Sequence, residues 1–295
     1  ISEALYNIDP SSTSAANMGI RSLKRKDYEK AEGFYTYALD NEPDEINKAQ
    51  YAYRLAQIYG ATNKNNSAKT FALKAAAFRS GWGDPYLLIG KGNPRLVGKN
   101  YALLPEVDKA FQQMSASAKK QGITIKVVSS YRSFEKQKNI WNNKFLRFKS
   151  QGMDDEAAID KIIEYSTLPG TSRHHWGTDI DIIDAGPPEV GDVLLPQKFH
   201  DNGPYNTLRE WMETHAKDYG FLLPYNRDEN RTGFKYEPWH YSYAPKSIPM
   251  LNQYLELDHR ELILSSDLNG ADGLDQEFLE SYIKTHVMGI EPSLL

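Results

Sequence analysis

The stretch SRHHWGTDID, residues 172–181, brings two histidines and two aspartates into one short segment that a glycine interrupts. A second compact motif, YEPWH at residues 236–240, adds one more carboxylate and one more histidine. Hydrolytic zinc sites need three protein ligands of these types, an open position for water and a base to take its proton. We therefore expect the two motifs to converge on one site, with the rest of the chain serving as scaffold or substrate contact.

Alternation of polar and apolar side chains predicts a β-strand from Asp179 to Ile183. Side chains in a strand alternate between its two faces, so Asp179 and Asp181 share one face and Ile180 and Ile182 take the other. The carboxylates are therefore expected to face the site while the isoleucines face a core.

The second motif falls in a predicted strand over residues 234–243. In a regular strand Glu237 and His240 would point to opposite faces. Pro238 lies between them, and proline within a strand is typical of a bulge or an edge. We therefore expect a bend that lets Glu237 and His240 converge.

Helical and extended patterns alternate around the two motifs. Apolar residues at helical spacing predict helices near residues 107–118, 133–145, 159–163, 208–216 and 278–287. Further strands are predicted at residues 123–130 and 221–225. Helices mixed with a small antiparallel sheet make this an α+β domain.

Residues 13–90 carry an internal repeat typical of helical hairpins. Its recurring positions are Gly19, Ala31, Tyr35, Ala38 and Pro43, followed by Ala56, Tyr59, Ala68 and Ala75. The spacing resembles that of tetratricopeptide repeats, which pack paired helices at small residues and bind peptides or partner proteins. Stable arrays usually need about three repeats, and only about two are found here. We favour a helical spacer and keep a protein partner as the alternative.

The composition changes at the run GKGNP, residues 90–94, which is rich in glycine and contains a proline. A third repeat starts at residues 86–90 and is not continued. Glycine and proline commonly mark loops between structured segments. We therefore divide the chain into a tetratricopeptide-like helical region, residues 1–90, and a second domain, residues 91–295.

Composition narrows the function classes. The 295 residues carry a net charge of −4 and include no cysteine. The lack of cysteine excludes disulfides, thiolate zinc ligands and a cysteine nucleophile. The charge gives no electrostatic footprint for nucleic acid, and no apolar run is long enough for a transmembrane segment. Because the chain starts at Ile1, we expect processing, and removal of an export signal is one form of it.

The candidate metal ligands are His174, Asp181 and His240. All three are suited to zinc, and no HExxH helix competes for the role. For a single histidine we would prefer a plainer interpretation, a hydrogen-bonded residue in an ordinary turn. Two histidines, each in a compact motif with an acid, favour the metal site.

These motifs together resemble a known family. S-x-H-x-x-G-x-x-x-D at residues 172–181, with E-x-W-H at residues 237–240, is similar to the zinc D-alanyl-D-alanine carboxypeptidases of the VanY type. The resemblance covers about residues 91–295 and implies a fold related to that of hedgehog signalling proteins. It implies three zinc ligands, His174, Asp181 and His240. It also implies that Glu237 is the catalytic base.

The same resemblance implies a substrate clamp on the turn SSYRS, residues 129–133. Arg132, with Gln137 and Ser172 nearby, is implied to receive the terminal carboxylate of the substrate. The position suits the role, because Arg132 follows a predicted strand and a guanidinium can grip a carboxylate with two parallel hydrogen bonds.

One residue departs from the family pattern. The family usually has a small residue, often alanine, at the position of Asp179. Because Asp179 shares a strand face with Asp181, we expect it to orient a ligand, meet a substrate amine or compete as a ligand. We keep Asp181 as the ligand because its spacing matches, and we place Asp179 among the substrate-facing residues. His175 and Trp176 either line the cleft or pack beside it.

A serine mechanism is the rival chemistry. The segments SFEK, residues 133–136, and SAKK, residues 117–120, both fit the S-x-x-K pattern of serine enzymes that also release D-alanine. No S-D-N or K-T-G partner accompanies either segment, and so short a pattern occurs by chance. We reject the serine route.

We therefore expect a zinc metallo-carboxypeptidase that removes the C-terminal D-alanine from peptidoglycan stem peptides. One alternative is an L,D-carboxypeptidase that acts on tetrapeptide stems. The other is a catalytically silent protein that binds peptides or cell wall through the helical repeats. The resemblance implies an extracytoplasmic location, in the periplasm or envelope of a bacterium.

Overall fold

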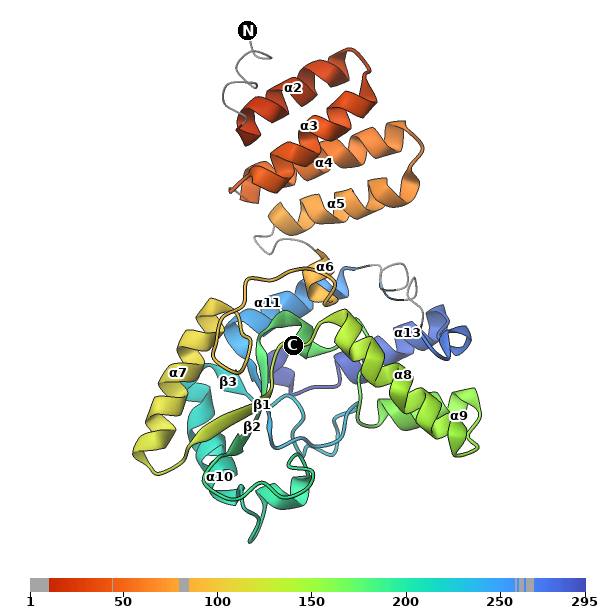
Figure 1. The fold of residues 1–295 in the computed structure, drawn as a ribbon. Helices are drawn as coiled ribbons and strands as arrows, with labels where there is room; N and C mark the ends of the chain where they lie inside the picture. The colour runs from red at the N-terminus through yellow and green to blue at the C-terminus, as the bar shows by residue number, and fades with distance from the viewer. Residues whose placement is uncertain (1–10, 44, 80–84, 258, 260–262, 264–267) are drawn as a thin grey trace. The chain divides into compact units, whose positions relative to one another are not determined.

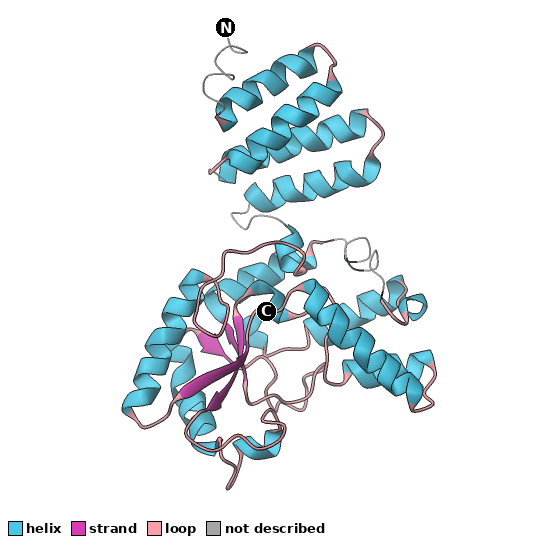
Figure 2. Cartoon of the chain, viewed as in Figure 1, coloured by secondary structure: helices cyan, strands magenta, loops and turns pink. Residues whose placement is uncertain are grey.

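A computed structural model describes residues 11–43, 45–79, 85–257, 259, 263 and 268–295 (Figure 1). The chain divides into two compact units, Ile1–Pro85 and Tyr86–Leu295. Figure 2 shows that the described helices and strands are not shared equally, since every strand belongs to the second unit. None of the described helices is both long enough and apolar enough to span a lipid bilayer.

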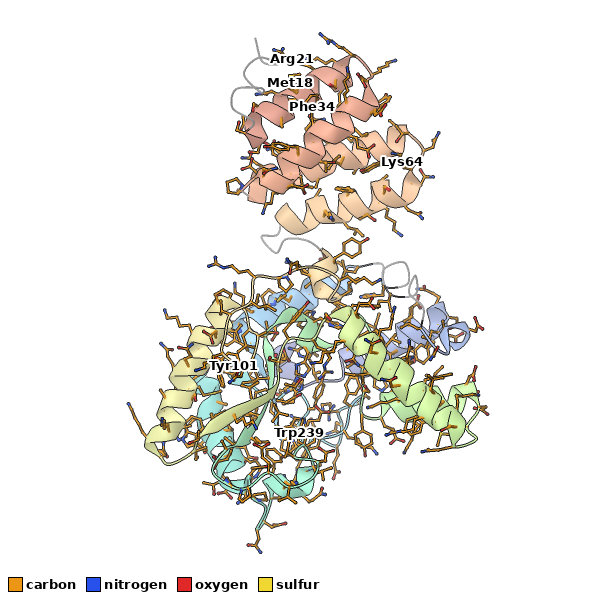
Figure 3. The ribbon with its side chains drawn as sticks, in the orientation of Figure 1. Met18, Arg21, Phe34, Lys64, Tyr101 and Trp239 are labelled. Carbon is orange, nitrogen blue, oxygen red and sulfur yellow. The ribbon has the colours of Figure 1, made fainter. Side chains whose placement is uncertain are left out.

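The first unit consists of helices that pack against one another in chain order. They are α2 (Ser12–Lys24), α3 (Tyr28–Asn41), α4 (Glu45–Ala61) and α5 (Asn65–Arg79). Gly19 lies so close to the ring of Tyr35 that an added Cβ would come within 2.7 Å of it. Lys64, labelled in Figure 3, forms an ion pair of 3.1 Å with Glu32 of α3. The expected helical hairpins are present, while their tetratricopeptide character stays a prediction.

The second unit is built on a four-stranded antiparallel sheet with the order β1-β2-β4-β3. Its strands are β1 (Ile125–Ser129), β2 (Asp179–Asp184), β3 (Phe221–Leu222) and β4 (His240–Tyr243). All six residues of β2 are buried, because β2 lies between β1 and β4 and is covered on both faces. The predicted α+β class is confirmed.

One face of the sheet carries the main apolar core. Ile180 and Ile182 point to this face and pack with residues of α7 (Pro105–Lys120) and α10 (Asn206–His215). The apolar stripe of α7 runs through Val107, Ala110, Phe111, Met114 and Ala118, which are all buried. In Figure 1, α7 and α10 lie on the same side of the sheet. The opposite face is therefore left to Asp179 and Asp181.

The helices α8 (Phe134–Ser150), α9 (Asp155–Ile163) and α13 (Gln276–Tyr282) lie on the other side of the sheet in Figure 1. The last of these continues into a π-helical turn, Ile283–Val287. A further helix, α11 (Ala244–Leu255), follows directly after β4. Ser133 is the N-cap of α8, because its hydroxyl accepts a hydrogen bond from the N–H of Lys136.

The strands are shorter than the sequence predicts. The strand expected over residues 234–243 is confined to His240–Tyr243, and the one expected over residues 221–225 to Phe221–Leu222. Pro238 has no N–H for a ladder, and the N–H of His240 bonds to the carbonyl of Glu237 at 3.1 Å. A turn over Glu237 to His240 thus takes the place of a strand and supplies the expected bend.

Residues 86–90 belong to the second unit. The indole N–H of Trp176 donates to the carbonyl of Leu88 at 2.9 Å, and the N–H of Phe134 donates to the carbonyl of Gly90 at 2.8 Å. Gly90 has a φ of +75°, and an added Cβ would lie 2.4 Å from Nδ1 of His175. This short segment therefore braces the 3₁₀ helix that follows residue 172 and the start of α8.

We predict that a fragment of residues 86–295 is more stable than a fragment of residues 91–295. The shorter fragment loses both hydrogen bonds above and the buried Leu88 and Ile89 side chains. Burial of one such side chain contributes about 1.5–3 kcal/mol, so we expect a loss of about 3 kcal/mol or more. Thermal unfolding of the two fragments should differ by about 6–12 °C. Equal melting temperatures would show that the segment is not part of this unit.

Candidate active site

His174 lies on a 3₁₀ helix, Arg173–Trp176, that leads into β2. The helix ends at Gly177, whose φ of +67° is in the left-handed region that favours glycine. An added Cβ at Gly177 would also meet the Leu96 side chain at 2.9 Å. The carbonyl of His174 accepts a hydrogen bond from the N–H of Arg132 at 3.0 Å. The backbone that carries His174 is therefore fixed from both sides.

Asp181 and His240 face each other across the β2–β4 ladder, where they are direct register partners. Directly opposed side chains in an antiparallel pair share one face, with Cβ atoms about 4.5–5.5 Å apart. The ring of His174 meets the ring of His240 edge to face, with centroids 4.8 Å apart. The 3₁₀ helix and β2, which are adjacent in sequence, and β4, which is distant from both, thus bring their ligand atoms within 4.8 Å of one another.

Two of the distances between these atoms, each to a different oxygen of Asp181, are close to those of a tetrahedral cation site. His174 Nε2 lies 3.3 Å from Asp181 Oδ2, and His240 Nδ1 lies 3.1 Å from Asp181 Oδ1. Two ligands about 2.0–2.1 Å from zinc at a tetrahedral angle are about 3.3 Å apart. Asp181 Oδ1 has no hydrogen-bond partner among the described residues, although His240 is so near. This arrangement is expected when both atoms are directed at a cation between them and not at each other.

The second nitrogen of His240 is held by Asp179. His240 Nε2 lies 3.0 Å from Asp179 Oδ1 and donates its proton there, which leaves Nδ1 free to face Asp181. Carboxylates that accept from the far nitrogen of a metal-binding histidine fix its tautomer and its ring orientation. Asp179 is fully buried and does not line the cavity. Of the three roles expected for Asp179, this geometry favours orientation of His240 over contact with substrate.

A buried network holds Asp179 in its charged form. Arg173 Nε donates to Asp179 Oδ1 at 3.0 Å, and the hydroxyls of Thr178 and Ser242 donate to Oδ2. Arg173 also donates to Ser242 at 2.6 Å, which closes the network. Burial opposes ionisation of the carboxyl, but Arg173 and His240 outweigh it and hold the pKa of Asp179 below its usual range.

Glu237 reaches the same centre from the turn before β4. Its Oε2 lies 3.4 Å from His240 Nδ1, and its side chain is 18% exposed while those of the three candidate ligands are 4–7% exposed. The N–H of Glu237 bonds to the carbonyl of Tyr225 at 3.0 Å, which anchors the turn. A carboxylate beside the ligand cluster with access to the cavity is the placement that a proton acceptor needs.

Arg132 projects into the cavity from the turn after β1. Its carbonyl accepts from Nδ1 of His175, and its guanidinium donates to Gln137 at 2.8 Å and to Ser129 at 3.1 Å. Gln137 also donates to the carbonyl of Thr167 at 2.7 Å, is fully buried and does not line the cavity. We therefore assign Gln137 to the support of Arg132, in place of the expected substrate contact.

These side chains open into one cavity of about 880 Å³. The residues lining it include Arg132, Ser172, His174, Asp181, Glu237 and His240. The hydroxyl of Ser172 is buried and has no hydrogen-bond partner among the described residues. An unpaired buried hydroxyl is costly, so a ligand that supplies its hydrogen bond would be favoured there.

His175 and Trp176 pack beside the cavity and do not line it. His175 Nε2 accepts from the N–H of Gly170 at 3.1 Å, so its proton sits on Nδ1 and points to the carbonyl of Arg132. Burial lowers the pKa of His175 to about 3, and the neutral ring is the form that can make both bonds. His175 therefore positions the Arg132 backbone.

The sequence analysis gave no role in the cavity wall to Tyr225, Trp239 or Lys144, which all line it. Tyr225 places its ring edge to face with His240, at a centroid distance of 4.9 Å. Trp239, labelled in Figure 3, lines the cavity and also packs against Phe199, with ring centroids 5.7 Å apart. Lys144 reaches the cavity from α8. Trp239 belongs to the E-x-W-H motif, and Lys144 lies seven residues after Gln137 and hence on the same helix face, whereas Tyr225 had no local signal.

Comparisons with known proteins agree on one family. A family model for D-alanyl-D-alanine carboxypeptidase, VanY, matches residues 100–246. A D-alanyl-D-alanine carboxypeptidase of Enterococcus faecalis is 28% identical over 159 residues, 54% of this chain and 52% of the relative. The bifunctional D-Ala-D-Ala dipeptidase and carboxypeptidase VanXYC of Enterococcus gallinarum is 30% identical over 143 residues, 48% of this chain and 67% of the relative. The chain thus belongs to the VanY D-alanyl-D-alanine carboxypeptidase family.

Solved structures with similar chains are also known. VanYB in complex with D-alanine-D-alanine has a TM-score of 0.44 and 23% identity, covering 60% of this chain and 91% of that one. The LD-carboxypeptidase LdcB has a TM-score of 0.39 and 27% identity, covering 59% and 75%. The chain spans about half the length of three curated relatives it matches, between 51% and 54%.

We predict that Asp179→Asn weakens zinc binding about 10- to 100-fold, the usual cost of losing such a partner of a ligand. The isosteric amide keeps a hydrogen bond to His240 but loses the charge that holds the imidazole in place. Competition with a chromophoric chelator would measure the dissociation constant. Ser242→Ala is the matched control, because it removes one hydrogen bond to Asp179 and keeps the carboxylate. An unchanged zinc affinity in Asp179→Asn would mean that Asp179 has a purely structural role.

Proposed function

We propose that this chain is a zinc carboxypeptidase that removes the C-terminal D-alanine from peptidoglycan stem peptides. One observation carries the proposal: the His174, Asp181 and His240 cluster, Glu237 and Arg132 all face a single cavity. Membership of the VanY family supports the same substrate class. We further propose an extracytoplasmic location, because the substrate is a component of the cell wall.

Zinc would be held by His174, Asp181 and His240, with Asp179 fixing the tautomer of His240. When bound in such a site, zinc acts as a Lewis acid that polarises a carbonyl and lowers the pKa of water to about 7. A set of two neutral imidazoles and one carboxylate suits zinc. The chain has no cysteine that would offer a competing thiolate site.

Glu237 would take the proton of the attacking water and pass it to the leaving amine. Its position supports this role, since Oε2 lies 3.4 Å from His240 Nδ1 and therefore beside the ligand cluster. The turn that carries Glu237 ends at His240, so the base and one ligand move together. A protein that only bound peptides would have no use for such a base, and this favours an enzyme over the silent-protein alternative.

Arg132 would bind the free carboxylate of the C-terminal residue. Its backbone is held by His174 and His175, and its guanidinium by Gln137 and Ser129, so its position is set before substrate arrives. A carboxylate held there would leave room for one residue beyond the cut and would make the enzyme an exopeptidase. Release of D-alanine from pentapeptide against tetrapeptide would distinguish cleavage after D-alanine from cleavage after an L-residue.

We predict that Glu237→Gln retains stoichiometric zinc while kcat falls about 10²–10⁴-fold, the contribution usual for a positioned general base. The amide keeps the shape of the side chain but accepts no proton. Metal analysis and D-alanine release would be measured on the same sample. His174→Ala is the companion variant, because it should lose zinc and activity together. An unchanged kcat in Glu237→Gln would assign the proton transfer to another group.

We also predict that Arg132→Lys lowers kcat/KM about 10- to 100-fold without changing zinc content. Hydrogen bonds to charged groups contribute about 1.5–3 kcal/mol, and lysine lacks the planar fork that grips a carboxylate at two points. A stem peptide with an amidated C-terminus should be a correspondingly poor substrate for the wild type. Equal cleavage of the acid and the amide by the wild type would instead point to an endopeptidase.

A further inference from the structure

Lys144 is a cation of the cavity wall whose charge is not matched. It lines the cavity from α8, is half-buried, and forms no hydrogen bond or ion pair with any residue that the structure describes. The other cations of the wall donate to side chains beside them, which are uncharged in the case of Arg132. Arg132 binds Gln137, Arg173 binds Asp179, and Lys235 binds Tyr165 and Glu164. Lys144 therefore differs from its neighbours.

The helix sets the spacing between Lys144 and Gln137, the residue that holds Arg132. Gln137, Trp141 and Lys144 follow the spacing i, i+4 and i+7, so they lie on one face of α8. Gln137 holds Arg132, and seven residues of α-helix advance about 10 Å along its axis. An extended peptide covers about 3.3–3.6 Å per residue, so this distance corresponds to about three residues of substrate.

The charges around Lys144 favour an incoming anion. Burial lowers the pKa of Lys144, and Arg147 and Arg132 lower it further, while Glu237 partly opposes them. An ammonium group that is partly removed from water and lies near other cations is stabilised when an anion binds beside it. Only one residue of the substrate lies beyond the cut, and Arg132 takes its carboxylate. A second carboxylate must therefore lie on the acyl side of the scissile bond.

We propose that Lys144 forms a second anion subsite, which receives a carboxylate carried by the substrate two or three residues before its C-terminal residue. This inference rests on the proposed function and narrows the substrate to doubly anionic peptides. The first carboxylate, on the C-terminal residue, binds Arg132 and sets the position of the cut. The second, on the acyl side, binds Lys144 and selects among peptides that share the same terminus.

The test uses matched peptides that end in D-Ala-D-Ala and differ in one group. The residue third from the C-terminus is glutamate in one peptide and glutamine in the other, and a second pair has the exchange at the fourth position. We expect the wild type to cleave the preferred glutamate peptide about tenfold more efficiently than its glutamine partner, mainly through KM. Lys144→Met should reduce that ratio to less than about twofold.

Two controls separate Lys144 from its surroundings. Lys136→Met removes an exposed lysine from the first turn of α8, outside the cavity, and should keep the wild-type preference. Equilibrium binding of the same peptides to full-length Glu237→Gln protein, with and without Lys144→Met, gives a readout that does not depend on turnover. The ratio of dissociation constants should show the same tenfold preference and the same loss.

The outcomes distinguish this inference from the proposed function. If the wild type cleaves glutamate and glutamine peptides equally, the subsite is overturned while the carboxypeptidase proposal stands. If Lys144→Met lowers kcat/KM by the same factor for both peptides, Lys144 serves the terminal carboxylate or the reaction itself, and the subsite is again overturned. If no peptide is cleaved, the proposed function fails. In that case the binding measurement still tests the subsite, which equal binding of the glutamate and glutamine peptides to Glu237→Gln protein would overturn.

Discussion

The arrangement around β2 is governed by the need to compensate the carboxylates that this strand buries. All six residues of this strand are buried, and Asp179, Asp181 and Asp184 are among them. An isolated buried charge is very unfavourable, so each carboxylate needs compensating partners. Asp184 accepts hydrogen bonds from two backbone N–H groups, Asp179 is paired with Arg173, and Asp181 faces two histidines. The central strand β2 is thus stable only when the elements beside it provide partners for its buried carboxylates.

This requirement links the scaffold to the site. Three segments, the 3₁₀ helix before β2, the start of β4 and the turn after β1, must adopt their positions together to satisfy β2 and the groups around it. The same contacts place the cluster of His174, Asp181 and His240 and the guanidinium of Arg132 around one cavity. His175 and Gln137 do not line the cavity, and both hold Arg132 in place. Both residues therefore act on the site through Arg132.

Much of this could be predicted from the sequence, and the failures are specific. The two-residue period of β2 correctly put Asp179 and Asp181 on one face, and the α+β class is confirmed. The strand predicted before His240 was wrong, because Pro238 and a turn replace it. Asp179 was placed among the substrate-facing residues, with orientation of a ligand as another expected role, and local spacing could not show that its carboxylate meets His240, 61 positions away. Lys144 was not predicted as a site residue. Whether a lysine has a partner depends on residues distant in sequence, and local patterns do not show these.

The sequence by itself determined which groups are available and in what local order: two histidines, their aspartates and a glutamate in short motifs, each beside a glycine or proline that shapes the backbone. These follow from local rules, since strand period and turn chemistry act over a few residues. Only the tertiary structure decided which nitrogen of His240 faces Asp181, that Asp179 orients this ring, and that Arg132 and Lys144 share one cavity. The two outcomes at His240 depend on contacts between residues about 60 positions apart, and burial in a common core is what brings such residues together.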